Sequence, residues 1–537
     1  MMDKLNEINY LLKKFLDTSN KTYYNKLSKL LIKDPKNNYL RFNLAVLESK
    51  IGLIEKALKN YKHLINTEYK IKALTNIYLM EIECKNYISA LKYIEMLLDI
   101  NNNDQNIIRD KSNVLNSLGL YYQEIRDSNK AENFFQQALK INYNSIEIIN
   151  NLAGYHREEG NYNKAIELYK KALLLDEKNL TVINNLSKTY FDMNKIHDSK
   201  KYALIGKKID KDNDDLKNNL SFILLKEAKY KEAWENFDGR LGLKDFRKNN
   251  LNSDILIKKI FKGHQINYED NILVIREQGI GDEILYSSMY TDLIKNYKNV
   301  TIECDGRLKN LFNKSFKKDN CFKNFSEISG NLNKLKKFDV ILYAGSLGKF
   351  FRNKSRDFTG KPYIFAEKEK IKSFKLDLNK FKKKYNIGIS WKSFKNRYSG
   401  EKSIKLNELK NIFDIKDCNF LNLQYGDIMN ELNSFNNQSK IKINNIQSLD
   451  IYNDFDNVAA VLSCLDLFIT VSNSTAHLAG ALGVNTILIK PINHALYHYW
   501  NQDDNITPWY KSVTLLDKKK FLVKENIIEK LIKKNLN

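Results

Sequence analysis

Hydrophobic and small residues recur in the first half of the chain with a period of 34 residues. Each period has an apolar residue, a small residue 13 positions later, and an aromatic or apolar residue four positions after that. The three series are Leu118, Leu152, Leu186 and Leu220; Ala131, Ala165, Ser199 and Ala233; and Phe135, Tyr169, Ala203 and Phe237. This spacing predicts pairs of packed helices, because the small residue lets two helices approach closely and the third residue fills the gap above them.

The clearest copy of this unit is "INNLAGYHREEGNYNKAIELYKKALLLDEKN", from Ile149 to Asn179, with Gly160 and Asn161 at the turn between its helices. Earlier segments with the same spacing bring the number of copies to about six, over residues 35–240. The period resembles that of the tetratricopeptide repeat, which implies an α-solenoid with a concave groove. We therefore expect residues 1–240 to form a repeat superhelix.

An asparagine precedes the key apolar residue in most copies, with Ser117 as the exception: Asn43, Asn76, Asn151, Asn185 and Asn219. Because each amide has a donor and an acceptor, such a ladder could hold the backbone of an extended peptide or protein partner in the groove. The pattern is similar to the asparagine ladder of eukaryotic O-linked N-acetylglucosamine transferases. A structural scaffold and a surface for homo-oligomer formation are the alternatives, since asparagine is abundant throughout the chain.

After residue 240 the period ends, and short apolar runs alternate with helical patterns. Continuous apolar runs are typical of buried parallel strands. The first group of predicted strands is "NILVIRE", "VTIEC" and "FDVILYAG", and the second is "YNIGISW", "NFLNLQYG", "LFITVS" and "TILIKP". We expect a linker over 241–270 and two Rossmann-like domains over 271–375 and 376–537, with a ligand cleft at the carboxyl ends of their strands.

The stretch "VIREQGIGDEILYSS" places Asp282 where the first of these strands passes into a helix. Gly279, Gly281 and Asp305 fit part of a dinucleotide-binding fingerprint, but Ile284 stands where the third glycine is required. Asp282 is then either a helix cap or a general base that accepts the proton of an incoming hydroxyl. The two roles are compatible, because a carboxylate at a helix N-terminus stays ionised.

Several segments in the same order resemble glycosyltransferase family 9, the heptosyltransferase-like group, and within it the subgroup with N-terminal tetratricopeptide repeats. These segments are "AWENFDGRL", "REQGIGDEILYSSMYTDLI", "KPYIFAE", "NIGISWKS", "NFLNLQYGD", "DNVAAVLSCLDLFITVSNSTAHLAGALGVNTILIKP" and "PWYKSVTLL". The resemblance implies a GT-B fold and transfer of a sugar from a nucleotide-activated donor to a protein or glycan acceptor. The implied transfer is inverting and needs no metal or other cofactor, and the family's base matches Asp282.

In such a transfer the leaving nucleotide diphosphate accumulates negative charge that the protein has to stabilise. The turn after Val471 offers hydroxyls and backbone N–H groups at a helix N-terminus, which suits an anion. The donor-binding candidates are Gly281, Lys392, Ser393, Lys402, Gln424, Ser472, Asn473, Ser474, Thr475 and His477, with Arg397 in the same basic loop as Lys402. For His477 a buried structural role is the alternative, and Trp509 and Tyr510 are expected to pack rather than to bind sugar.

The sequence departs from the family pattern at three of these positions. Many members have Asp where Ser472 stands and Thr where Asn473 stands, and Lys402 replaces an Arg that is common in the subgroup. The alternative to an enzyme is therefore a catalytically inactive adaptor, whose second half only binds a nucleotide sugar or a partner protein.

Composition changes this picture little. The net charge of +24 would normally suggest nucleic acid, but the lysines are spread along the chain without a clustered basic stripe, so no nucleic-acid partner is expected. The five cysteines are far apart and form no CxxC pair, which favours neither a disulfide framework nor a zinc site. With no signal-peptide core and no run of about 18 apolar residues, we expect a cytoplasmic protein without a transmembrane segment.

Overall fold

The computed structural model describes residues 2–244, 246, 265–318, 320–329, 335–394, 399–447, 449–492, 496–500, 505–523 and 527–536. The chain divides into two compact units, Met1–Thr189 and Tyr190–Asn537. Among the described residues, no helix combines the length and the apolar character that crossing a membrane requires.

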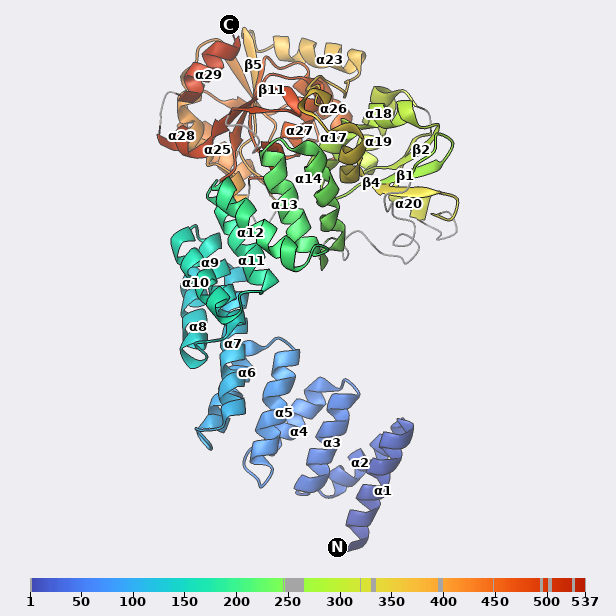
Figure 1. Ribbon diagram of the computed structural model, residues 1–537, viewed down its shortest axis with the longest axis vertical. Coiled ribbons are helices and arrows are strands. Elements are labelled where there is room, and N and C mark those ends of the chain that lie inside the picture. The colour runs from blue at the N-terminus through green and yellow to red at the C-terminus, as the bar shows by residue number, and fades with distance from the viewer. Residues whose placement is uncertain are drawn as a thin grey trace. The chain divides into compact units, whose positions relative to one another are not determined.

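The first unit is built entirely of helices that pack in consecutive pairs (Figure 1). These helices are α1 (Met2–Thr18), α2 (Lys21–Lys33), α3 (Asn38–Lys50), α4 (Ile54–His63), α5 (Lys70–Glu83), α6 (Tyr87–Leu98), α7 (Gln105–Glu124), α8 (Ser128–Ile141), α9 (Ile146–Glu158) and α10 (Tyr162–Leu175), while α11 (Leu180–Asp192) crosses the unit boundary. The small residues of the repeat pattern, such as Ala131 and Ala165, are completely buried, as are the aromatic residues Phe135 and Tyr169. The predicted helical repeat array is therefore confirmed.

The turn inside each helix pair needs one residue in the left-handed backbone conformation. Gly160 takes this position with φ of +79°, as does Gly52 with +78°. The equivalent positions of other copies are occupied by residues other than glycine, whose backbone adopts the left-handed conformation only at some cost in free energy. Those residues are Lys85, Arg126, Asn194 and Ala228.

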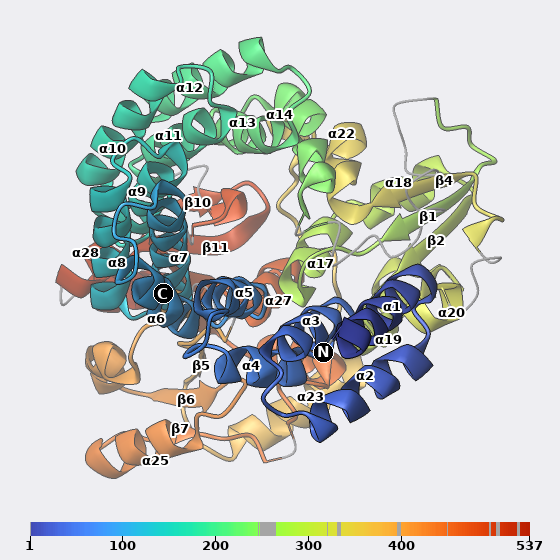
Figure 2. The ribbon, with the colours of Figure 1, turned by 90° about the horizontal axis from the view of Figure 1, so that it is seen from below.

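The second unit begins with further helices that continue the repeat pattern: α12 (Ile196–Ile209), α13 (Asp214–Lys226), α14 (Tyr230–Phe237) and the 3-10 helix η1 (Asp238–Gly242). Helix α14 packs against α22 (Gly348–Phe351), which belongs to the α/β part of the unit (Figure 2). The indole of Trp234 is fully buried there and donates a hydrogen bond to the Arg352 carbonyl at 2.7 Å. Most of the predicted linker, residues 247–264, lies outside the described residues.

The first sheet has four parallel strands in the order β3-β2-β1-β4. The strands are β1 (Asn271–Ile275), β2 (Asn299–Glu303), β3 (Phe322–Lys323) and β4 (Val340–Tyr343). Helices α17 (Ile280–Ser287), α18 (Tyr290–Asn296), α19 (Gly306–Phe316) and α20 (Phe325–Ser329) connect them, and η2 (Ala344–Leu347) follows β4. All three predicted strands are present at their predicted places.

The second sheet has seven strands in the order β10-β11-β9-β8-β5-β6-β7, all parallel to their neighbours except β10. The strands are β5 (Tyr385–Ile389), β6 (Cys418–Asn422), β7 (Ile443–Asn444), β8 (Leu467–Val471), β9 (Thr486–Lys490), β10 (Ile506–Thr507) and β11 (Tyr510–Asp517). Its helices include α23 (Lys368–Asn379), α24 (Ser399–Lys402), α25 (Met429–Gln438), α26 (Phe455–Leu462), α27 (Ser474–Leu482), α28 (Lys518–Val523) and α29 (Ile527–Leu536), with 3-10 helices η5 (Leu406–Asp414) and η7 (His498–Trp500). The four predicted strands are found, and β11 adds a long strand that the apolar pattern did not single out.

In each sheet, later strands are added first on one side of the first strand and then on its other side. In the first sheet this happens between β1 and β4, and in the second between β5 and β8. In open parallel sheets such a point leaves a crevice outside the carboxyl ends of the strands, where ligands bind. The loops that follow β1, β5 and β8 are therefore the expected places for a site.

Candidate functional site

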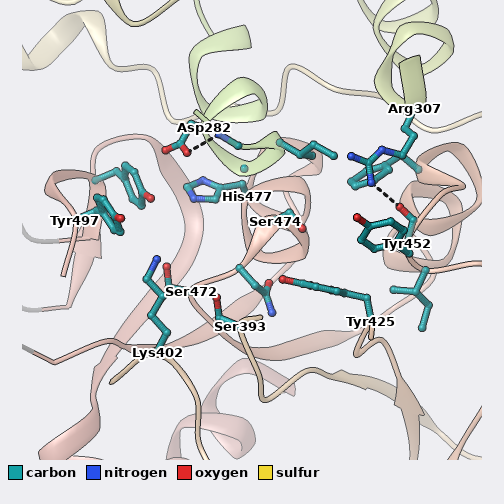
Figure 3. Close-up of a pocket in the computed structure, with 17 residues that line it drawn as sticks. Asp282, Arg307, Ser393, Lys402, Tyr425, Tyr452, Ser472, Ser474, His477 and Tyr497 are labelled. Carbon is teal, nitrogen blue, oxygen red and sulfur yellow. Dashed lines mark hydrogen bonds between the residues drawn. The ribbon is translucent and has the colours of Figure 1, made fainter. Parts of the chain in front are cut away.

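A pocket of about 260 Å³ lies among these loops, and loops and helices that accompany both sheets line it (Figure 3). Its walls come from the turn before α17, from the loop that follows β5, and from the N-terminus of α27. In the close-up, Asp282, His477 and Ser474 lie in the middle, Lys402, Ser472 and Tyr497 at one end, and Arg307, Tyr425 and Tyr452 at the other (Figure 3). The two crevices expected from topology thus form one site.

Asp282 is the third residue of α17, and Gly279 is the N-cap. Its carboxylate accepts the backbone N–H of Gly279 at 3.3 Å, so the interpretation of Asp282 as a plain N-cap is corrected to the acidic member of a capping box. Tyr499 lines the same pocket, and burial together with the charge of Asp282 raises the pKa of its hydroxyl. Asp282 is 9% exposed, and it lines the pocket.

Gly281 allows α17 to lie directly against α27. A Cβ atom at this position would come within 2.9 Å of Cδ2 of His477 and 3.5 Å of Cα of Ser474. The N-termini of the two helices therefore meet at the pocket. This close approach accounts for the glycine beside Asp282, although it does not show a contact with a ligand.

The N-terminus of α27 presents polar groups from three consecutive residues to the pocket: Ser472, Asn473 and Ser474. Asn473 is the N-cap, and its side chain accepts the N–H of Ala476 at 3.0 Å and donates to Ser390 Oγ at 3.0 Å. The Ser472 hydroxyl accepts a hydrogen bond from Trp500 Nε1 at 3.1 Å. Thr475 is buried and does not line the pocket.

His477 is enclosed by aromatic rings while it borders the pocket. Its Nδ1 lies 3.0 Å from the Tyr510 hydroxyl, and its ring stacks on Trp500 with centroids 4.9 Å apart. Burial, together with the nearby charge of Lys402, lowers the pKa of His477 to about 3. The imidazole is therefore neutral at physiological pH, and it contributes shape and hydrogen bonding rather than charge.

The basic loop after β5 divides into residues that face the pocket and residues that do not. Lys402 and Ser393 line it, and Lys402 Nζ lies 4.4 Å from the ring centroid of Tyr497. Lys392 instead pairs with Glu431 at 2.5 Å. Gln424 is buried outside the lining, where its side-chain oxygen accepts the backbone N–H groups of Trp391 and Lys392. Arg397 lies outside the described residues.

The end of the pocket opposite Lys402 carries residues that the sequence patterns did not identify: Arg307, Tyr425 and Tyr452. The guanidinium of Arg307 lies 4.9 Å from the Tyr452 ring centroid and donates to the Tyr452 carbonyl at 3.2 Å. Asp305 holds Arg307 at 2.9 Å, so its carboxylate is not aimed at a ribose as a dinucleotide fingerprint would require. The position of Arg307 just after β2, beside β1, was the signal that could have found it.

Glu283 follows Asp282 but points to a different environment. It is 1% exposed, accepts the backbone N–H of Asp305 at 3.0 Å, and does not line the pocket. Burial raises the pKa of Glu283 to about 8, although Asp305 N–H and Arg276 act in the opposite direction. Glu283 therefore supports the segment that carries Arg307 instead of providing a second pocket carboxylate.

The asparagines of the repeats mostly bond to other parts of the array. In the first unit, Asn151 Nδ2 donates to Asn116 Oδ1 at 3.1 Å, and Asn185 Nδ2 donates to Asn150 Oδ1 at 2.9 Å, so amides link consecutive copies. Asn43 Nδ2 donates to the Tyr39 carbonyl of its own helix. Four of the predicted ladder residues are partly exposed, whereas Asn219, in the second unit, is buried.

Comparison with known proteins supports the repeat part of the chain. Tetratricopeptide repeat models match residues 112–145 and 146–179. Protein FlbA of Caulobacter vibrioides is 24% identical over 256 residues, which cover 45% of this chain and 42% of FlbA, so the match spans less than half of that protein. Among solved structures, a tetratricopeptide repeat protein from Parabacteroides merdae is 19% identical, with 45% of this chain and 96% of the other covered and a TM-score of 0.30. The C-terminal part of a repeat protein from Cytophaga hutchinsonii is 12% identical, with 46% and 100% covered and a TM-score of 0.34.

The repeat models and the helical fold together show tetratricopeptide repeats in the first part of the chain, which α/β sheets follow. Repeats of this class stack into extended surfaces that bind other proteins or peptides. They suggest a role in protein interaction for this chain.

Proposed function

We propose that the protein is a glycosyltransferase with a GT-B fold, which moves a sugar from a nucleotide-activated donor to a protein or glycan acceptor. The observation that supports this most is the composition of one pocket. It combines a carboxylate, Asp282, with a cation, Lys402, and with the N-terminus of α27, at the carboxyl ends of two parallel sheets. A base and an anion-binding group on opposite sides of a reacting sugar are what inverting transfer requires.

In this reaction Asp282 accepts the proton of the acceptor hydroxyl as its oxygen attacks the anomeric carbon. The bond from that carbon to the nucleotide diphosphate breaks, and the diphosphate leaves with the bonding electron pair. Ser472, Ser474 and the backbone N–H groups at the start of α27 donate hydrogen bonds to the departing phosphate, and Lys402 balances its charge. These groups supply the stabilisation without a metal ion.

The repeats then have the role of recruiting the acceptor or a partner protein. The partly exposed amides of Asn43, Asn76, Asn151 and Asn185 are the groups that we propose for peptide contact. Asn151 and Asn185 already donate to neighbouring asparagines, which leaves their carbonyl oxygens as the acceptors for a peptide N–H.

The second candidate function is an inactive adaptor that binds a nucleotide sugar or a partner without transfer. The observation that favours it is Ser472, because many relatives in the resembled family have an acid there. In this chain the Ser472 hydroxyl is bonded to buried Trp500, and a carboxylate is absent from that point of the pocket lining.

Donor hydrolysis by the purified protein tests the proposal. Asp282→Asn keeps an oxygen that can accept the Gly279 N–H but removes the base, so turnover should fall by about 10² to 10⁴-fold. Glu269→Gln, at a surface carboxylate in the turn before β1 that pairs with Lys298, is the matched control and should retain full turnover. Equal turnover in wild type and Asp282→Asn would remove Asp282 as the base.

A thermal-shift screen with UDP-, GDP-, ADP- and CMP-sugars identifies the donor that binds. Together with the hydrolysis assay, it distinguishes the enzyme hypothesis from the adaptor hypothesis. A ligand that binds only the folded state raises the melting temperature. A donor that stabilises the protein but is not hydrolysed, in the presence or absence of candidate acceptors, would favour the adaptor.

A further inference from the structure

A second pocket, of about 200 Å³, lies beside the segment that connects the two sheets. Its walls come from the end of α17, from α18, from the residue after α22, from residues 358–363 of the connecting segment, and from the turn between β10 and β11. Of the described residues, none lines both this pocket and the one that contains Asp282. The volume is much more than one water needs, but it is below the about 300 Å³ at which pockets for drug-sized molecules begin. It therefore suits a small ligand.

A buried guanidinium is one of the groups that line this second pocket. The side chain of Arg352 is 7% exposed. Its Nη1 donates to Asp292 Oδ2 at 2.8 Å and to the Phe351 carbonyl at 2.7 Å, and its Nη2 donates to the Ser288 carbonyl at 2.7 Å. Because a guanidinium has five N–H groups, two of them have no acceptor in the part of the chain that the structure describes.

Two further residues of the lining contain a buried polar atom without a hydrogen-bond partner among the described residues. These atoms are the hydroxyl oxygen of Ser288 and the indole Nε1 of Trp509, a residue that is 3% exposed. Buried polar groups are nearly always paired in folded proteins, so three unpaired groups around one cavity require an explanation. Each of the three can donate a hydrogen bond, and the molecule that satisfies them is therefore an acceptor.

The charge of the lining identifies what kind of acceptor fits. Its described residues include two cations, Arg352 and Lys361, and one carboxylate, Asp292. The pocket therefore has a net positive charge, and a guanidinium bonds more strongly to an anion than to a neutral acceptor. Another part of the wall is apolar and includes Phe358 and Pro508.

We propose that this pocket binds a small organic anion, a carboxylate or a phosphate on a compact ring-shaped body. The anionic oxygens accept hydrogen bonds from Arg352, Ser288 and Trp509. Lys361 balances the remaining charge, and the ring packs against Phe358. The proposal concerns binding at a site separate from Asp282, so it holds whether or not the protein transfers a sugar.

Thermal denaturation of the full chain with three simple probes tests the proposal. Benzoate and phenyl phosphate at about 10 mM should raise the melting temperature, because a ligand that binds only the folded protein stabilises it. Benzamide, which has the same ring without the charge, should not. The stronger of the two anions shows whether the site prefers a carboxylate or a phosphate, and the dependence of the melting temperature on its concentration gives the dissociation constant.

Two variants change the pocket in opposite directions. Ser288→Ala removes an unpaired hydroxyl, so it should weaken binding of the stronger probe about tenfold without lowering the stability of the unliganded protein. Asp292→Asn keeps an oxygen for Arg352 but removes the negative charge from the lining, so it should strengthen binding about fivefold. The melting transition of each unliganded variant shows that it is folded.

The control is Lys402→Gln, which removes the cation of the other pocket and should leave the dissociation constant unchanged. If neither anion raises the melting temperature, or if either Ser288→Ala or Asp292→Asn binds as wild type does, the proposal is overturned. Loss of binding in Lys402→Gln would also overturn it, because the probes would then occupy the pocket that contains Asp282.

Discussion

At the residue scale, two neighbouring acids show how environment divides roles. Asp282 and Glu283 both lie in the first turn of α17. The capping bond to Gly279 holds Asp282 at the pocket, whereas Glu283 is buried against the backbone of Asp305. Their order in the sequence gives no hint of this, because one step along a helix rotates the side chain by about 100°.

The buried pair Arg240–Glu277 is expected to be a large contributor to the stability of the second unit. Glu277→Gln removes the charge that balances a guanidinium 3% exposed, and leaves Asp238, at 3.0 Å, as its ionic partner. We expect the free energy of unfolding to fall by about 3 kcal/mol, since Asp238 also pairs with Lys349 and balances the buried guanidinium only in part. Urea denaturation measures this.

The matched control for that variant is the exposed pair Lys298–Glu269, in which both side chains are more than half exposed. Glu269→Gln should change stability by less than about 1 kcal/mol. Similar losses in the two variants would mean that the Arg240–Glu277 pair has no special role.

At the element scale, the repeats differ in the residue that takes the left-handed position of the turn inside each helix pair. Gly160 and Ala228 occupy the same left-handed position of their copies, with φ of +79° and +56°. A Cβ atom on Gly160 would have no atom within 4 Å, so an alanine there would be strained only by its backbone conformation. Substitutions at the two positions therefore measure the cost in stability of a side chain in the left-handed conformation.

We expect Gly160→Ala to lower the free energy of unfolding by about 1 kcal/mol, because an L-residue in the left-handed region is disfavoured by about that amount. Ala228→Gly should have the opposite sign and a smaller size, since glycine gains unfolded-state entropy as it relieves the strain. Chemical denaturation of the two variants checks both signs. Two changes of the same sign would contradict this account of the turn.

At the scale of the whole molecule, three buried titratable groups of the second unit have large pKa shifts that make its stability depend on pH. Burial lowers the pKa of His477 and of His498 to about 3, below the value of 6.5 that applies when they are unfolded. Their contribution is complete above pH 6.5 and is lost as the pH falls toward 3. The contribution of Glu283 to stability depends on pH in the opposite direction, because burial raises its pKa to about 8. This contribution is complete below pH 4.5 and is lost as the pH rises through 8.

Between pH 4.5 and 6.5 the two histidines outweigh Glu283, so the melting temperature of the second unit should be highest at about pH 6 to 7. His498→Phe should flatten the decline on the acidic side, and Glu283→Gln should flatten the decline on the alkaline side. Calorimetry over pH 4 to 9 measures both slopes. An unchanged acidic slope in His498→Phe would show that this histidine is not neutral in the folded protein.

The sequence by itself determined the helical repeats and seven of the strands, because these follow from local periodicity. A small residue every 34 positions has to be buried between helices, and an uninterrupted apolar run has to form a buried strand. The sequence also marked Asp282, Lys402 and the Ser472–Ser474 turn, since they stand where strands end.

Only the tertiary structure decided which of these residues share one pocket. Lys392 and Gln424 stand at strand ends as well, yet one pairs with Glu431 and the other bonds to the backbone. Arg307, Tyr452 and Tyr499 reach the pocket from segments far apart in the chain, and Arg240 reaches Glu277 across 37 positions. These contacts depend on strand order and on how α17 packs against α27, which no local pattern encodes.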